Sequence, residues 1–211
     1  QESPTQFIQV AKFLKKQGVR APEIFETDLS QGFVMLEDFG NVTFRRLLLK
    51  EPNEIEKLYT LAVHVLQHLH ETATQKPPFL ESYSLGYFIN GIMLFMDWVW
   101  PATFGQTAPD AVKEEFKNLW AQAFMAVPSV PDSMMLRDYH VDNLMLLPGK
   151  TPLDSCGVLD FQDAMWGPVV YDFISLLEDA RYDAPPALME KLWQLFLVPI
   201  PKDQHENYKM A

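Results

Sequence analysis

Three oxygen-bearing side chains, Asp138, Asn143 and Asp160, place the strongest constraint on how this chain folds. Asp138 and Asn143 lie five positions apart in one loop, and Asp160 follows a short apolar segment further along. The apolar segments 144–147 and 157–159, with a proline–glycine turn between them, predict a pair of short strands. We expect this small hairpin to bring the three side chains together in one cleft.

The chemistry of these side chains indicates transfer of a phosphoryl group from ATP to a hydroxyl. Asp138 can accept the proton of the attacking hydroxyl as the catalytic base. The amide oxygen of Asn143 and the carboxylate of Asp160 are hard ligands of the kind that Mg²⁺ prefers. Each residue alone also has a plainer interpretation, as an aspartate that caps a turn or a carboxylate that ends a strand. Their combination favours a site that uses ATP and Mg²⁺ as cofactors.

Composition narrows the classes of partner. The 211-residue chain carries a formal net charge of −11 and has a pI of about 4.8, and such a surface repels nucleic acid. The same charge suits a cationic substrate, although net charge alone does not select one. The single cysteine excludes an intrachain disulfide framework. The signatures of serine hydrolases, dinucleotide-binding folds and P-loop enzymes do not occur in the sequence.

Neither a signal peptide nor a membrane span is predicted from the sequence. The N-terminus is polar and lacks a basic segment followed by an apolar run. No uninterrupted apolar stretch reaches the length of about 18 residues that a transmembrane helix needs. We therefore expect a soluble, cytoplasmic protein without a membrane partner.

The pattern of apolar residues predicts an α+β protein. We expect a helix from the Ser3–Pro4 cap to Gly18 and a strand at residues 33–36. Further helices are predicted from the Asn53/Glu56 capping box to about residue 70, from 85 until Pro101, from an Asp110 cap, at 171–181, and from Pro185–Pro186. A change in character near Gly40–Thr43 indicates a hinge. It predicts an N-terminal lobe of residues 1–40 and a helical lobe of residues 41–211.

At these motifs the chain resembles the aminoglycoside phosphotransferase and choline kinase group, whose members are small-molecule kinases with a bilobal, protein-kinase-like fold. The flanking residues are most similar to bacterial anomeric kinases, which phosphorylate N-acetylmuramic acid and N-acetylglucosamine at the C1 hydroxyl during cell-wall recycling. The residues that carry the resemblance are Asp138, Asp142–Asn143, Leu159–Phe161, Gly167–Pro168, Tyr171–Asp172, and the wider runs Leu136–Leu144 and Leu159–Ala164.

The resemblance also implies what the N-terminal lobe does. The segment Val34–Asp38 looks like the hinge strand of the group, so Glu37, Asp38 and Phe39 are expected to bring backbone groups to the adenine of ATP. The alternative is a core strand that ends in a turn. A glycine-rich loop and a phosphate-binding lysine are expected upstream of residue 1, so we interpret the chain as a fragment with an incomplete N-lobe, formed by a helix and a β hairpin.

Four residues are candidates for substrate binding. Asp97 can accept hydrogen bonds from sugar hydroxyls and Trp98 can pack on a sugar ring, although aromatic residues in an apolar stretch usually fill a core. Arg137 can pair with a substrate carboxylate, such as the lactyl group of muramic acid, or with an acid of the protein. His140 can orient substrate or Asp138, and a structural hydrogen bond is the favoured alternative. The resemblance also implies that Asp172 supports the loop through backbone hydrogen bonds.

Three functions follow from these observations. The leading hypothesis is an ATP-dependent small-molecule phosphotransferase acting on an amino sugar. The second keeps the mechanism and changes the acceptor to an aminoglycoside or an amino alcohol such as choline. The third, from another class, is a non-catalytic pseudokinase that acts as a binding module.

Overall fold

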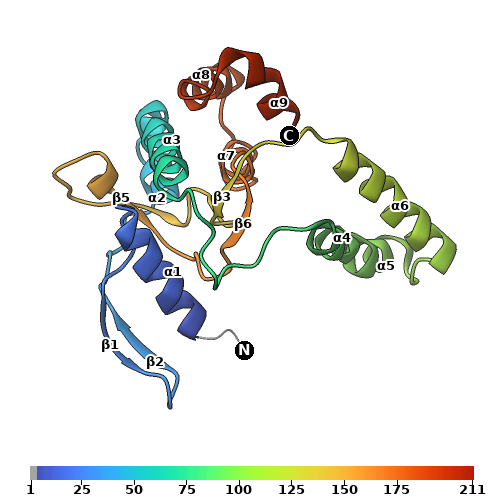
Figure 1. Cartoon of the computed structure of the whole chain (residues 1–211), viewed down its shortest axis with the longest axis horizontal. Helices are drawn as coiled ribbons and strands as arrows, with labels where there is room; N and C mark the ends of the chain where they lie inside the picture. Colours follow the sequence, from blue (N-terminus) through green and yellow to red (C-terminus); the bar gives the residue numbers. More distant parts are fainter. Residues whose placement is uncertain (1–3) are drawn as a thin grey trace.

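The computed structural model, which describes residues 4–211, confirms an α+β fold in which the strands form three separate antiparallel pairs (Figure 1). The pairs are formed by β1 (Ile24–Asp28) with β2 (Phe33–Leu36), β3 (Asp132–Met135) with β6 (Met165–Pro168), and β4 (Leu144–Leu146) with β5 (Cys156–Val158). The α-helices are α1 (Pro4–Lys16), α2 (Phe44–Leu48), α3 (Ile55–Thr72), α4 (Leu85–Leu94), α5 (Trp100–Phe104), α6 (Asp110–Ala126), α7 (Tyr171–Leu177), α8 (Pro186–Phe196) and α9 (His205–Met210). Short turns of other helix types are η1 (Pro52–Glu54), η2 (Phe95–Val99), η3 (Leu153–Ser155) and η4 (Lys202–Gln204).

The N-terminal segment follows the sequence prediction closely. Helix α1 ends at Lys16, and Gly18 then takes a φ of 80°, a left-handed conformation that glycine adopts without strain. The predicted Ser3 cap lies outside the described residues. Strand β2 covers the predicted residues 33–36, and β1 pairs with it in an antiparallel hairpin.

Three predicted helix boundaries between residues 50 and 126 are wrong. The Asn53/Glu56 capping box does not form, because Pro52 starts a 3₁₀ turn and α3 then begins without a side-chain cap. Asp110 lies in the first turn of α6 rather than at its cap, which is Pro109. Pro101 does not stop the helix, since the π-helical turn η2 precedes it and places Pro101 in the first turn of α5. The missing N–H of Pro101 falls where the π-helical turn has already interrupted the α-helical hydrogen-bond pattern, so the helix continues through it.

The main core joins the N-terminal helix to the later helices. Val10 and Leu14 of α1 lie in the same buried cluster as residues of α3, α7 and α8. The ring of Phe7 stacks on the ring of Phe161 with centroids 5.0 Å apart. Phe161 directly follows Asp160 in the sequence. Packing among the described residues therefore does not separate residues 1–40 from residues 41–211, and that division stays a prediction.

Helices α4, α5 and α6 form an arm that projects from this body (Figure 1). Aromatic pairs hold the arm together, with ring centroids 4.8 Å apart for Phe88–Phe124 and 5.8 Å apart for Phe95–Phe116. Tyr83, just before α4, contacts the ring of Tyr171 at the start of α7 with centroids 5.5 Å apart. The arm is thus anchored next to the segment that follows β6.

Among the described residues, no helix combines the length and the apolar character that crossing a membrane would require.

Candidate active site

The topology of two strand pairs brings the predicted loop and Asp160 together. The loop 136–143 connects β3 to β4, and the segment 159–164 connects β5 to β6. Because β3 pairs with β6 and β4 pairs with β5, both connections run between the same two strand pairs. They lie side by side, and the N–H of Leu159 donates to the carbonyl of Asn143 over 2.9 Å. Strands β3 and β6, which sequence reasoning missed, are what closes this arrangement.

The side chain of Asn143 lies between the two aspartates. Its Nδ2 donates to the backbone carbonyl of Asp138 at 3.0 Å and lies 3.4 Å from Oδ2 of Asp160. The other oxygen of Asp160 accepts from Gln162 at 2.6 Å. Asp160 has a φ of 58°, which is uncommon for a residue other than glycine, and it lies two residues after the end of β5. The three predicted residues are neighbours, while their roles as base and metal ligands stay predictions.

The donor set fits a magnesium ion that arrives with a nucleotide. Asn143 uses its nitrogen to hold the loop, so its amide oxygen remains for a cation, and Asp160 is exposed. Among residues 4–211, no group of three or more His, Cys, Asp and Glu side chains could hold a metal by itself. Mg²⁺ is commonly bound by one or two protein oxygens and completes its shell with water and phosphate oxygens. Two adjacent hard donors match that pattern.

Asp172 supports the beginning of the loop, as the sequence predicted. Its carboxylate is 1% exposed and accepts the backbone N–H groups of Leu136 at 2.6 Å and Arg137 at 2.8 Å. These bonds fix the backbone where Arg137 takes a left-handed φ of 73°. Burial raises the pKa of Asp172 from its ordinary 3.8 to about 7.

The raised pKa of Asp172 predicts a pH dependence of stability. An acid whose pKa is higher in the folded state binds its proton more tightly there than in the unfolded chain. Wild type should therefore lose stability relative to Asp172→Asn as the pH rises from about 4 to about 7, by at most about 1.4 kcal/mol per pH unit. Urea unfolding of both proteins across this range measures the difference, and a difference that does not change with pH would contradict the prediction.

His140 and Arg137 are held by contacts within the protein. His140 is 8% exposed, and its Nε2 lies 3.2 Å from Nδ2 of Asn143. Burial and then the charge of Arg181 lower the pKa of His140, which keeps the ring neutral and able to accept a hydrogen bond from that amide. The guanidinium of Arg137 lies 5.1 Å from the centre of the Tyr87 ring and donates to the carbonyl of Asp163 at 3.3 Å.

The predicted hinge lies against the strand that leads to Asp160. The carboxylate of Glu37 pairs with Arg20, and this contact lowers the pKa of Glu37. The backbone N–H of Glu37 donates to the carbonyl of Glu23 at 2.8 Å. The ring of Phe39 packs so closely on Gly157 that a Cβ there would lie 2.6 Å from a ring carbon. Asp38 accepts the N–H of Gly40 at 2.7 Å, which closes the turn after the strand. Contact of residues 37–39 with adenine stays a prediction.

Asp97 and Trp98 lie in the π-helical turn η2 of the arm. Asp97 pairs with Lys113 of α6 at 3.0 Å, and this ion pair ties η2 to α6 rather than to the loop. Trp98 is 73% exposed, so it is not the buried core residue of the plainer interpretation. Single-turn π segments occur frequently at functional sites, and a free indole face suits sugar packing.

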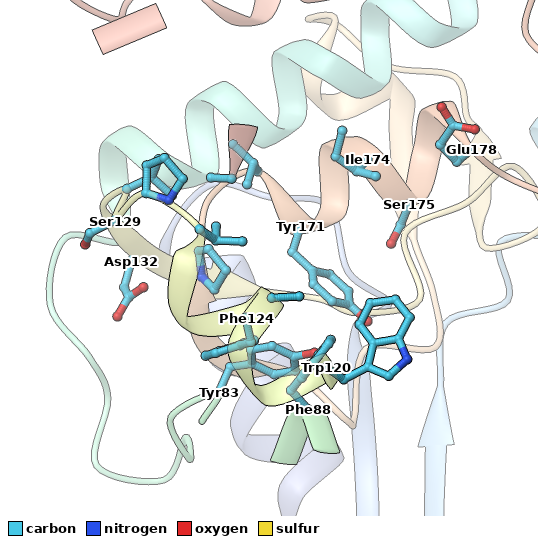
Figure 2. Close-up of a pocket in the computed structure, with 17 residues that line it drawn as sticks. Tyr83, Phe88, Trp120, Phe124, Ser129, Asp132, Tyr171, Ile174, Ser175 and Glu178 are labelled. Atoms are coloured by element: carbon cyan, nitrogen blue, oxygen red, sulfur yellow. The ribbon is translucent and has the colours of Figure 1, made fainter. Parts of the chain in front are cut away.

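An open cavity of about 720 Å³ lies between the arm and helix α7 (Figure 2). Aromatic rings form much of its wall, namely Tyr83, Phe88, Trp120, Phe124 and Tyr171. Asp138, Asn143 and Asp160 do not line this cavity. It is therefore separate from the candidate active site, although Tyr171 begins the helix that carries Asp172.

Sequence reasoning missed Asp179 as a loop contact. Its buried carboxylate accepts the N–H of Val141 at 3.3 Å. The predicted helix 171–181 is wrong at its end, because α7 stops at Leu177 and Asp179 lies in the following turn. The available signal was an acid in the last turn of the predicted apolar helix.

The chain is similar to known phosphotransferases in sequence and in fold. The profile of the phosphotransferase enzyme family matches residues 1–206. The chain is 30% identical over 183 residues, 85% of its length, to an N-acetylmuramate/N-acetylglucosamine kinase of Neisseria meningitidis serogroup B, of which it covers 53%. It also superposes on a streptomycin–ATP–APH(2'')-IIa ternary complex with a TM-score of 0.67 and 14% identity, covering 98% of this chain and 70% of that one. For a choline/ethanolamine kinase family protein from Mesorhizobium loti the TM-score is 0.64 at 14% identity, covering 97% and 65%.

The likeness to these solved structures defines a protein with the protein-kinase-like fold. The chain belongs to the phosphotransferase enzyme family. It spans about half the length of the curated relatives that it matches.

Proposed function

We propose that the complete gene product is an ATP- and Mg²⁺-dependent kinase that phosphorylates a hydroxyl of an amino sugar, N-acetylmuramate or N-acetylglucosamine. The observation that carries this proposal is the position of Asn143, bonded to the Asp138 carbonyl and 3.4 Å from the Asp160 carboxylate. The kinases that match most of this chain at 30% identity support the choice of acceptor. A cytoplasmic location follows from the use of ATP, and the acidic surface argues against a nucleic-acid partner.

Each residue has a distinct role in this proposal. Asp138 orients the acceptor hydroxyl and accepts its proton, while Asn143 and Asp160 hold Mg²⁺ through their side-chain oxygens. When bound, the metal neutralises charge on the phosphate oxygens. Residues 37–39 receive the adenine through backbone groups. Asp97, Trp98, Arg137 and His140 are assigned to the acceptor side, with His140 acting through Asn143.

A screen of ATP consumption by the complete gene product tests the proposal. N-acetylmuramate and N-acetylglucosamine are compared with aminoglycosides and choline, each with and without Mg²⁺. Turnover restricted to the amino sugars supports the proposal, and turnover restricted to the cationic acceptors favours the second hypothesis. That alternative draws on the net charge of −11. Absence of turnover on every acceptor would favour a binding module.

Arg137 supplies a test of acceptor choice. Its guanidinium lies over the Tyr87 ring beside the loop, where it can meet the lactyl carboxylate of muramate. Arg137→Met keeps the apolar stem but removes the charge. We expect the KM for N-acetylmuramate to rise about 10- to 100-fold, the value of one charge-assisted hydrogen bond. The KM for N-acetylglucosamine, which lacks this carboxylate, is the internal control, and an equal rise for both sugars would contradict the assignment.

A further inference from the structure

A second set of contacts holds the loop at Val141, between Asp138 and Asn143. The N–H of Val141 donates to Oδ2 of Asp179 at 3.3 Å, and its carbonyl accepts the N–H of Arg45 at 3.0 Å. Its side chain is fully buried in the core. One peptide segment of the loop is thus held from both sides, by helix α2 and by the turn after α7.

Asp179 is bonded through both of its oxygens. Its side chain is 0% exposed. While Oδ2 accepts from Val141, Oδ1 accepts the backbone N–H of Arg181 at 2.9 Å and its Nη1 at 3.2 Å. A buried carboxylate is costly unless hydrogen bonds and a positive charge compensate it, and here three donors do so. The same carboxylate therefore links the loop firmly to one short turn.

Arg181 extends the contact to the next residue of the loop. Its Nε lies 3.9 Å from Oδ2 of Asp142, and Nη1 of Arg45 lies 3.6 Å from the same oxygen. All three side chains are partly exposed, so these ion pairs are individually weak. Together with the backbone bonds they fix residues 141 and 142 against two separate elements.

We propose that Asp179 and Arg181 are positioning residues that fix the catalytic loop between Asp138 and Asn143. This inference rests on the proposed kinase function. Asp172 holds the loop at residues 136 and 137, and Asp179 holds it at residue 141, so Asp138 lies between two fixed points. Phosphoryl transfer depends on alignment of the reacting groups, which is lost when the loop shifts by about 1 Å.

Asp179→Asn is the sharpest variant, because it keeps the shape and loses one acceptor. The asparagine oxygen can replace the carboxylate oxygen that faces Val141 or the one that faces Arg181, but not both. The other position is taken by the NH₂ group, which donates and cannot accept. We expect kcat of the complete gene product to fall about 10- to 100-fold while the KM for ATP stays unchanged. Deuterium uptake by the backbone amides of residues 138–143, followed by mass spectrometry, should rise in parallel.

Asp154→Asn is the matched control. Asp154 also accepts a backbone N–H, from Thr151 at 3.2 Å, but it lies in an exposed turn away from the loop. Its kcat and its deuterium uptake at residues 138–143 should equal those of wild type. A purely structural role of Asp179 would lower the thermal midpoint and the active fraction, and would leave kcat per folded molecule unchanged.

Arg181→Lys serves where Asp179→Asn does not fold, because it keeps a positive charge beside the buried Asp179 carboxylate and leaves the backbone N–H of residue 181 in place. It should raise loop exchange and lower kcat about two- to fivefold, because the bonds from the Arg181 side chain to Asp179 and Asp142 are weakened. Exchange needs no substrate, so it decides the inference even where the acceptor screen shows no turnover and the proposed function fails. Unchanged uptake at residues 138–143 in the folded variants would overturn the inference, as would an unchanged kcat in an active enzyme.

Discussion

Asp160→Ala should lower Mg²⁺- and ATP-dependent turnover of the complete gene product by about 100- to 1,000-fold or more, because it removes a carboxylate from the phosphate site. The protein should remain folded. Asp160 is exposed, and its partners are the polar side chains of Gln162 and Asn143. The assay is initial velocity against Mg²⁺ concentration, with the thermal unfolding midpoint measured on the same samples.

The backbone at Asp160 calls for a second variant. A φ of 58° is tolerated better by aspartate and asparagine than by alanine, so Asp160→Ala adds strain of about 1 kcal/mol. Asp160→Asn keeps the conformational tolerance and one oxygen ligand but removes the charge. Turnover should fall in both variants while only Asp160→Ala loses stability. Full activity of either variant at ordinary Mg²⁺ concentration would rule out Asp160 as a metal ligand.

The sequence predicted the local hairpin of the site because short apolar strands and a proline–glycine turn are local signals. Strands β4 and β5 lie within a residue or two of the predicted segments. The second pairing, β3 with β6, joins residues 30 or more positions apart, such as Asp132 with Pro168. No local pattern specifies such a pairing, because it depends on packing across the whole core.

The backbone partners of Asp172 were predictable from the resemblance to a known family. Asp172 was assigned to loop support because that family has an aspartate at this helix start, and its two bonds confirm the assignment. Asp179 was missed because its helix ends four residues earlier than the apolar pattern predicts. The exposure of Trp98 was not predictable either, since an apolar stretch predicts burial while the helical arm leaves this ring exposed. Burial depends on which neighbours pack against an element, and those neighbours are distant in sequence.

Asp138→Asn should lower kcat about 100- to 10,000-fold with little change in the KM for ATP. The substitution keeps size and removes the ability to accept a proton. It also leaves the local structure intact, because Asn143 bonds to the backbone carbonyl of Asp138 and not to its carboxylate. Asn143 and Asp160 therefore keep their positions, and any loss reports on the base alone.

Because the Asp138 carboxylate does not hold Asn143 or Asp160 in place, the roles of Asp138 and Asp160 can be separated by experiment. Loss of Asp160 should be partly offset by higher Mg²⁺ concentration, since metal affinity is what the carboxylate supplies. Loss of Asp138 should show no such recovery, because proton acceptance does not depend on metal affinity. Steady-state kinetics of Asp138→Asn and Asp160→Asn across a Mg²⁺ series measures both effects. A common Mg²⁺ response would mean that the two residues act as one metal site, and Asp138 would then not be a general base.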